Sequence, residues 1–199
     1  MSVINWEIVT KENALNGVDF TVGLQLEGDF CYATEVTAGP SFIAIKNKVI
    51  TNKKNSKIRA MIRKSCNNME PFLFLRLHNN EAYVMKMESN ISIYKLNFSS
   101  GSAFSIQDPI SSGTTLIEPN KTYNVSFSCY ELLDGSTIFD VDILNSYGVW
   151  ENEIKEVLTP DIAEGDMGFG NYYRFSNLTS DCKRVFYDRI EILTPVEFI

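Results

Sequence analysis

Two pairs of carboxylates come nearest to the spacing of i and i+2 or i+4 that acid–base chemistry on one face of a strand requires. Asp140 and Asp142 alternate with apolar residues, so they share one face of a predicted strand, and Asp188 precedes Glu191 by three residues. Retaining glycosidases place two such carboxyls about 5–5.5 Å apart. His78 is the only histidine and no Gly-x-Ser-x-Gly elbow accompanies it, which argues against a serine triad. We expect Asp140 and Asp142 to lie on an ordinary wet face.

Two segments combine aromatic rings with amides, which are the side chains that recognise sugars. A sugar presents an apolar ring face to an aromatic side chain and hydroxyls to amides and acids. We predict two glycan-binding loops, one with Asn145, Tyr147, Trp150 and Asn152 and the other with Asn171, Tyr172, Tyr173 and Arg174. Packing of these rings against the core is the alternative in both places.

Basic residues are concentrated between positions 46 and 64, a segment that contains no acid. The chain has 18 basic and 25 acidic residues, so the remainder holds 18 − 8 = 10 bases and a charge of 10 − 25 = −15. We predict a basic docking strip made of Lys46, Lys48, Lys53, Lys54, Lys57, Arg59, Arg63 and Lys64. A solvated strand edge is the alternative. The net charge of −7 argues against a nucleic-acid partner.

An acidic loop offers oxygen ligands for a structural calcium ion. Asp161, Glu164 and Asp166 lie close together in the sequence, although their spacing is not that of an EF-hand. A solvated acidic loop is the alternative. No other cofactor is indicated, because the sequence has no glycine-rich phosphate-binding motif and its cysteines lack zinc-site spacing.

The N-terminal sequence has neither the basic nor the apolar region of a signal peptide, and no apolar stretch is long enough to span a bilayer. We therefore expect synthesis in the cytoplasm and no membrane insertion, and we consider a virion surface as the final location. Without a secretion signal, the cysteines should be reduced. The four thiols concerned are Cys31, Cys66, Cys129 and Cys182.

Apolar and polar residues alternate with a period of two along most of the chain, which is typical of strands with one buried and one wet face. Clear examples lie at 20–26, 58–63, 72–77, 83–88, 123–129 and 139–143. Turn signals such as Asp134-Gly135 separate these runs. The segment 151–158 is the one helix candidate, with a loop as the alternative. The pattern predicts an all-β fold in which residues 1–199 form a single antiparallel two-sheet sandwich domain.

Between residues 57 and 192 the order of these features resembles the concanavalin A-like lectin/glucanase superfamily. The segments that carry the resemblance are 71–77, the hairpin 82–96, 121–127 with the turn at 134–135, and the glycine-rich 165–170 followed by 186–192. The resemblance implies a jelly-roll sandwich, in a superfamily of glycosidases, lectins and non-catalytic binding modules. The hydrolytic signature Glu-x-Asp-x-x-Glu of that superfamily does not occur in the sequence.

The last two of these segments suggest specific structural roles. Gly168 and Gly170 should permit close strand approach while Met167 and Phe169 point into the core. Asp188, at a strand end, should accept backbone hydrogen bonds.

The sequence favours a non-catalytic lectin-like module that serves a larger assembly. By fold analogy, our leading hypothesis is a capsid decoration or fibre protein that contacts capsid or other virion proteins and surface glycans. A glycoside hydrolase acting on a polysaccharide is one alternative, and it requires two of the acids named above in one groove. A secreted lectin is another, and it requires disulfides among the four cysteines.

Overall fold

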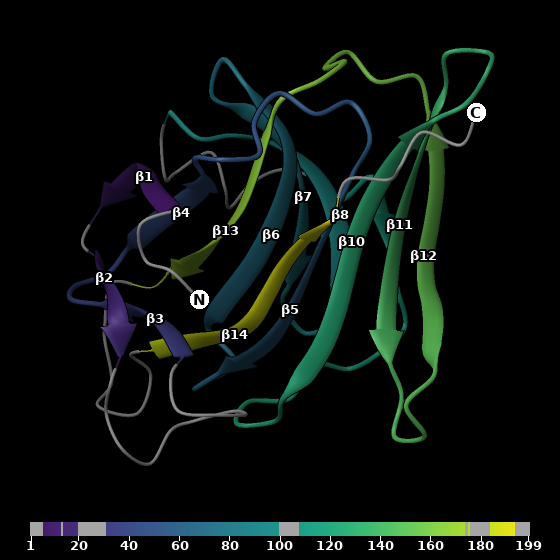
Figure 1. The fold of residues 1–199 in the computed structure, drawn as a ribbon. Coiled ribbons are helices and arrows are strands. Elements are labelled where there is room, and N and C mark those ends of the chain that lie inside the picture. The colour runs from purple at the N-terminus through teal and green to yellow at the C-terminus, as the bar shows by residue number, and fades with distance from the viewer. Residues whose placement is uncertain are drawn as a thin grey trace.

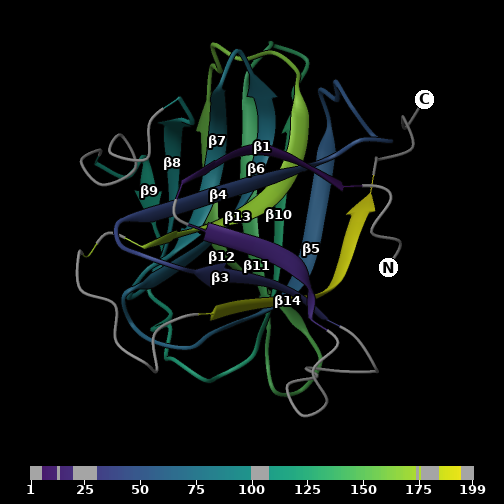
Figure 2. The ribbon, with the colours of Figure 1, turned by 90° about the vertical axis from the view of Figure 1, so that its left-hand side faces the viewer.

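In the computed structural model, the period-two runs that lie within the described residues form strands. The structure describes residues 6–12, 14–19, 31–99, 108–173, 175 and 184–193. Two antiparallel sheets of seven strands each pack face to face (Figures 1 and 2). This confirms the predicted all-β two-sheet sandwich. None of the described segments is a helix that could cross a membrane.

Sheet A is built from strands of both halves of the chain, which places distant segments side by side. Its order is β1 (Trp6–Glu12), β4 (Ser41–Asn47), β13 (Asp166–Tyr173), β6 (Met69–His78), β7 (Glu81–Met87), β8 (Ile91–Asn97) and β9 (Ser111–Ser112). The glycine-rich β13 thus lies between β4 and β6, and Figure 2 shows it from the side of β1 and β4.

Sheet B lies on the other side of the core. Its order is β12 (Trp150–Leu158), β11 (Thr137–Leu144), β10 (Tyr123–Glu131), β5 (Ser56–Lys64), β14 (Arg184–Leu193), β3 (Cys31–Val36) and β2 (Ala14–Asp19). The β11–β12 hairpin forms one edge of this sheet (Figure 1).

The segment 151–158 is strand β12, so neither the helix nor the loop prediction is correct. It pairs with β11, with a register shift between Val141 and Asp142, and Ile154 is buried in the core. Pairing with a long neighbouring strand therefore prevails over a weak local helix preference. The predicted strand at 20–26 lies outside the described residues.

Inward-facing residues of both sheets form the main core. On β5, Ile58, Ala60 and Ile62 face inward, and they pack with residues such as Phe127 of β10 and Phe169 of β13. These side chains are no more than 3% exposed. Non-directional apolar burial of this kind is the main stabilising term for such a sandwich.

The outer face of sheet A is also apolar, contrary to the expectation that each strand has a wet face. A second cluster contains Phe42, Ala44, Phe72, Phe74, Leu77, Ala82, Val84, Tyr94, Leu96, Phe98 and Tyr172. Phe42 and Phe72 stack with their ring centroids 5.7 Å apart. Strands buried on both faces read as nearly continuous apolar runs, and β6 has that character.

The glycines of β13 make this second cluster possible. A Cβ atom on Gly168 would lie 1.9 Å from the Ile45 carbonyl oxygen and 2.6 Å from the Phe74 ring. The bare backbone at Gly168 and Gly170 lets phenylalanine rings of β6 lie against β13. Met167 and Phe169 point inward and are fully buried, as predicted.

The cysteines correct a further expectation. Cys66 is disulfide-bonded, so the prediction of four reduced thiols is wrong at that position. Cys129 is free and buried. The side chains of Cys31 and Cys182 lie outside the described part of the chain.

Candidate functional site

The turn between β11 and β12 is held by one asparagine side chain. The Asn145 Oδ1 atom accepts hydrogen bonds from the backbone N–H groups of Tyr147, at 2.9 Å, and Val149, at 3.0 Å. Its Nδ2 atom donates to Glu151 Oε1 at 2.6 Å. Because Asn145 organises the turn, Tyr147 projects from it with 89% of its surface exposed.

Next to this turn, polar side chains line up across the outer face of sheet B. Strand register places Asn152 opposite Asp142, Asp142 opposite Ser126, and Ser126 opposite Arg59. The Asn152 Nδ2 atom donates to Asp142 Oδ1 at 3.1 Å, and Lys57 Nζ lies 3.7 Å from Asp142 Oδ2. The row therefore crosses four neighbouring strands and presents an amide, a carboxylate and a guanidinium together.

Trp150 lies at the hairpin end of this row. The residue is 37% exposed, and the Arg59 guanidinium lies 5.1 Å from the ring centroid. Arg59 can extend across the intervening strands because the residue opposite it on β10, Ser126, has a short side chain. We call Lys57, Arg59, Asp142, Trp150 and Asn152 the Trp150 surface. It combines an accessible aromatic ring with fixed hydrogen-bonding groups.

The second predicted glycan-binding segment is not a loop. Asn171, Tyr172 and Tyr173 belong to β13 in sheet A, and each is no more than 3% exposed. Tyr173 packs in the main core and Tyr172 in the second apolar cluster, so these residues have the structural role that was the alternative. Arg174 lies outside the described residues.

The eight basic residues from 46 to 64 do not form one strip, because strand alternation and turns separate them. They divide among the outer face of sheet B (Lys57, Arg59 and Arg63), the outer face of sheet A (Lys46), the exposed β4–β5 connection (Lys48, Lys53 and Lys54) and the interior (Lys64). Lys46 is engaged locally, since its Nζ atom lies 2.8 Å from Asp166 Oδ2 and 3.1 Å from Glu7 Oε1. A docking strip through all eight residues is therefore excluded.

Lys64 is 2% exposed and cannot contact a partner. Its Nζ atom donates to the Glu88 carbonyl oxygen and lies 3.5 Å from the Met87 carbonyl oxygen. Burial lowers the pKa of Lys64 to about 8, although the nearby Glu70 and Glu88 carboxylates oppose the shift.

The lowered pKa of Lys64 predicts a pH-dependent stability. Unfolded Lys64 titrates near pH 10.4, so between about pH 8 and 10.4 the unfolded chain holds a proton that the folded chain has lost. Stability from this group therefore rises with pH in that window. From pH 7 to 9.5, we expect the unfolding free energy of wild type to gain about 1–2 kcal/mol relative to Lys64→Met in urea titrations. A constant difference across this range would contradict the assignment.

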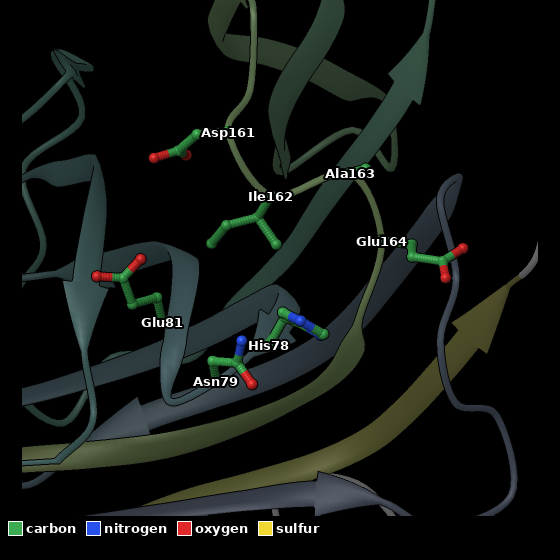
Figure 3. A pocket seen from close by; sticks show the side chains of 7 residues that line it. All are labelled: His78, Asn79, Glu81, Asp161, Ile162, Ala163 and Glu164. Atoms are coloured by element: carbon green, nitrogen blue, oxygen red, sulfur yellow. The ribbon is translucent and has the colours of Figure 1, made fainter.

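A shallow pocket of about 370 Å³ lies between the β6–β7 turn and the β12–β13 connection. Its lining consists of His78, Asn79, Glu81, Asp161, Ile162, Ala163 and Glu164. Figure 3 shows Glu81 and Asp161 on one side and Glu164 on the other. The three carboxylates can accept hydrogen bonds, but the imidazole of His78 is the one ring in the lining against which a sugar could pack.

Two of the three carboxylates predicted as calcium ligands, Asp161 and Asp166, are bound to other side chains. The Asp161 carboxylate accepts a hydrogen bond from the Tyr83 hydroxyl at 2.9 Å and pairs with Lys95, which lowers the Asp161 pKa. Asp166 pairs with Lys46 and accepts the Asn52 backbone N–H at 3.1 Å. Within the described segments no group of three metal-ligating side chains occurs, so the predicted calcium cluster is not formed.

The acids considered for a hydrolase lie on separated strands. Asp140 and Asp142 are on β11, Asp188 and Glu191 are on β14, and β10 and β5 lie between. Three strand spacings, about 14 Å, exceed the carboxyl separation of about 5–9.5 Å in glycosidases. Asp188 accepts a backbone hydrogen bond from Arg189 at 2.7 Å, as predicted. An enzymatic role would therefore have to use two acids of one strand, Asp140 with Asp142 or Asp188 with Glu191.

Comparisons with known proteins agree on the architecture. No protein-family model and no curated protein matches the sequence. Among solved structures, the chain is similar to the carbohydrate-binding module CBM66 from Bacillus subtilis, with a TM-score of 0.62, 13% identity and 94% of each chain covered. It is also similar to the exoplasmic/lumenal domain of VIP36 in its Ca²⁺/Man3GlcNAc-bound form, with a TM-score of 0.58, 10% identity, and 98% of this chain and 86% of that chain covered.

A third similar structure is an enzyme, the PL-14 alginate lyase from Aplysia kurodai. Its TM-score is 0.57 at 8% identity, with 94% of this chain and 91% of that chain covered. At these identities the similarities establish the jelly-roll type of sandwich and nothing about activity.

The sequence predicts Trp150 and Asn152 as binding residues, but it does not show that Asp142 and Arg59 lie beside them. The sequence alone marks Asp142 as a candidate catalytic acid and Arg59 as a candidate docking residue. Their position beside Trp150 depends on the order and register of β5, β10, β11 and β12. The pocket was not predicted either, because it joins two segments about 80 residues apart in the sequence.

Proposed function

We propose that this chain is a non-catalytic carbohydrate-binding module and that a glycan binds on its Trp150 surface. The observation that carries the proposal is the partly exposed Trp150 ring beside the Asp142–Asn152 pair. An aromatic ring can pack against the apolar face of a sugar while the carboxylate and amide take its hydroxyls. The groups already hold one another, so little ordering is needed on binding.

The similar structures support this function at the level of fold. One is a carbohydrate-binding module and one a domain crystallised with an oligosaccharide, and both share the sandwich over most of the chain. The similar alginate lyase keeps an enzymatic role as the second candidate. A lyase or hydrolase would need reacting groups in the right geometry, and the separated acids of β11 and β14 favour binding without catalysis.

The disulfide at Cys66 supports an oxidising location for the folded protein. We place the module outside the cytosol or on the surface of an assembly. A more specific version of this proposal is that the module is attached to a virion through capsid proteins.

The Trp150→Ala variant tests the proposed site. Removing the ring eliminates the sugar platform, and we expect glycan affinity to fall at least about tenfold, the loss of roughly 1.4 kcal/mol or more. The measurement is binding to a glycan array that contains neutral and acidic oligosaccharides, followed by calorimetry on the strongest ligand.

Leu133→Ala provides the control, because Leu133 is fully exposed in the β10–β11 turn. It should bind like wild type. Unchanged binding by Trp150→Ala would remove Trp150 from the site, and an array with no bound glycan would reject the function.

A further inference from the structure

Two arginines on the outer face of sheet B have no ion-pair partner among the residues that the structure describes. Arg59 lies 5.1 Å from the Trp150 ring centroid and Arg63 lies 5.3 Å from that of Phe186. Within the described part of the chain, neither guanidinium forms a hydrogen bond or an ion pair, and the Nε atom of each is buried without a partner. Glu191 is opposite Arg59 in the strand register but forms no ion pair with it.

This is unusual in a chain with 25 acidic and 18 basic residues. Other cations near the two arginines are paired: Lys57 with Asp142 and Lys54 with Glu131. A guanidinium that lies on an aromatic face keeps its terminal Nη N–H groups free of that contact, and two of them match a carboxylate in a bidentate geometry. The charge of Arg59 is therefore available to an external anion beside the sugar platform.

The two arginines also define a direction. Both project outward from β5 and are four residues apart, which corresponds to about 13 Å along the strand. An extended anionic chain that contacts the Trp150 surface and follows β5 would meet Arg59 first and Arg63 next.

We propose that the ligand is a polysaccharide that carries carboxylates, a polyuronate, with one carboxylate bound by Arg59 and the chain continuing along β5 to Arg63. This inference rests on the proposed carbohydrate-binding function and specifies its ligand class. A neutral glycan would leave both guanidinium groups without an ion-pair partner in the described part of the chain.

The test compares polygalacturonate, alginate and polyglucuronate with their carboxyl-reduced counterparts, which keep the sugar chain and lose its charge. In affinity electrophoresis and calorimetry, we expect wild type to bind at least one polyuronate about tenfold or more tighter than its reduced form, the size of one charge-assisted hydrogen bond. Arg59→Gln should abolish this preference, whereas Arg59→Lys should retain part of it because it keeps the charge. Added salt should weaken the preference in wild type.

Lys121→Gln is the matched control, because it removes an exposed cation that is paired with Glu118 elsewhere on the molecule. It should keep the wild-type preference. Equal binding of the charged and reduced chains, or a preference that survives in a folded Arg59→Gln protein, would overturn the inference and leave glycan binding intact. Binding to dextran sulfate or single-stranded DNA without binding to any polyuronate would also overturn it. If no neutral or acidic glycan binds, the proposed function itself fails.

Discussion

Replacing Arg76 by Met is expected to lower the unfolding free energy by about 3–5 kcal/mol, because buried groups would lose their charged partner. Arg76 is fully buried although it carries a charge. It donates from Nε to the Lys54 carbonyl oxygen at 3.1 Å and from Nη1 to the Ile162 carbonyl oxygen at 3.0 Å. Nη2 donates to the Lys54 carbonyl oxygen at 2.9 Å and to Thr137 Oγ1 at 3.2 Å. One side chain thus joins the β4–β5 connection, the pocket segment and β11.

The measurement is urea unfolding, with Arg184→Met as the control arginine. Arg184 pairs with Glu35 at 3.0 Å, and both side chains are about one-third exposed, so its loss should cost much less. Similar unfolding midpoints for the two variants would show that Arg76 does not hold these segments together.

The second large effect is expected at Gly168, where an alanine would collide with the backbone of β4. Its Cβ atom would lie 1.9 Å from the Ile45 carbonyl oxygen and 2.8 Å from the Lys46 Cα atom. Because backbone atoms of a central strand cannot move independently, Gly168→Ala should cost about 3 kcal/mol or more. Thermal and urea unfolding would both register the loss.

Gly135→Ala is the matched comparison. Gly135 has a φ of 83° in the β10–β11 turn, and a Cβ atom there would meet nothing within 4 Å. Its cost should be limited to the left-handed backbone, about 1 kcal/mol. A Gly168→Ala protein as stable as Gly135→Ala would contradict the close packing of β13 against β4.

The period-two pattern was sufficient to predict the sandwich, because alternation is a local property of each strand. The second apolar cluster was less visible. Phe72 and Phe74 belong to it, and the glycines that accommodate their rings lie about 95 residues later on β13. Tyr172 and Tyr173 are buried in the same glycine-rich strand. Composition alone does not show this, because a segment with glycines and aromatic residues can equally be a binding loop.

The candidate site was predictable only in part. Trp150 and Asn152 follow from local composition, since they flank a turn and combine a ring with an amide. Arg59 was identified as basic, but its place over Trp150 requires the pairing of four strands in a defined register. For Lys64 the local composition is misleading. It directly follows the outward-facing Arg63, so its side chain points to the opposite face of β5 and is buried.

Nuclear magnetic resonance of the tryptophan indoles tests the glycan site most directly. The chain has two tryptophans, and Trp6 packs against Phe169 with its ring centroid 4.9 Å away. On titration with the strongest glycan from the array, the Trp150 indole N–H signal should shift with saturation while that of Trp6 stays in place. A saturating glycan that leaves the Trp150 signal unmoved would contradict binding on this surface.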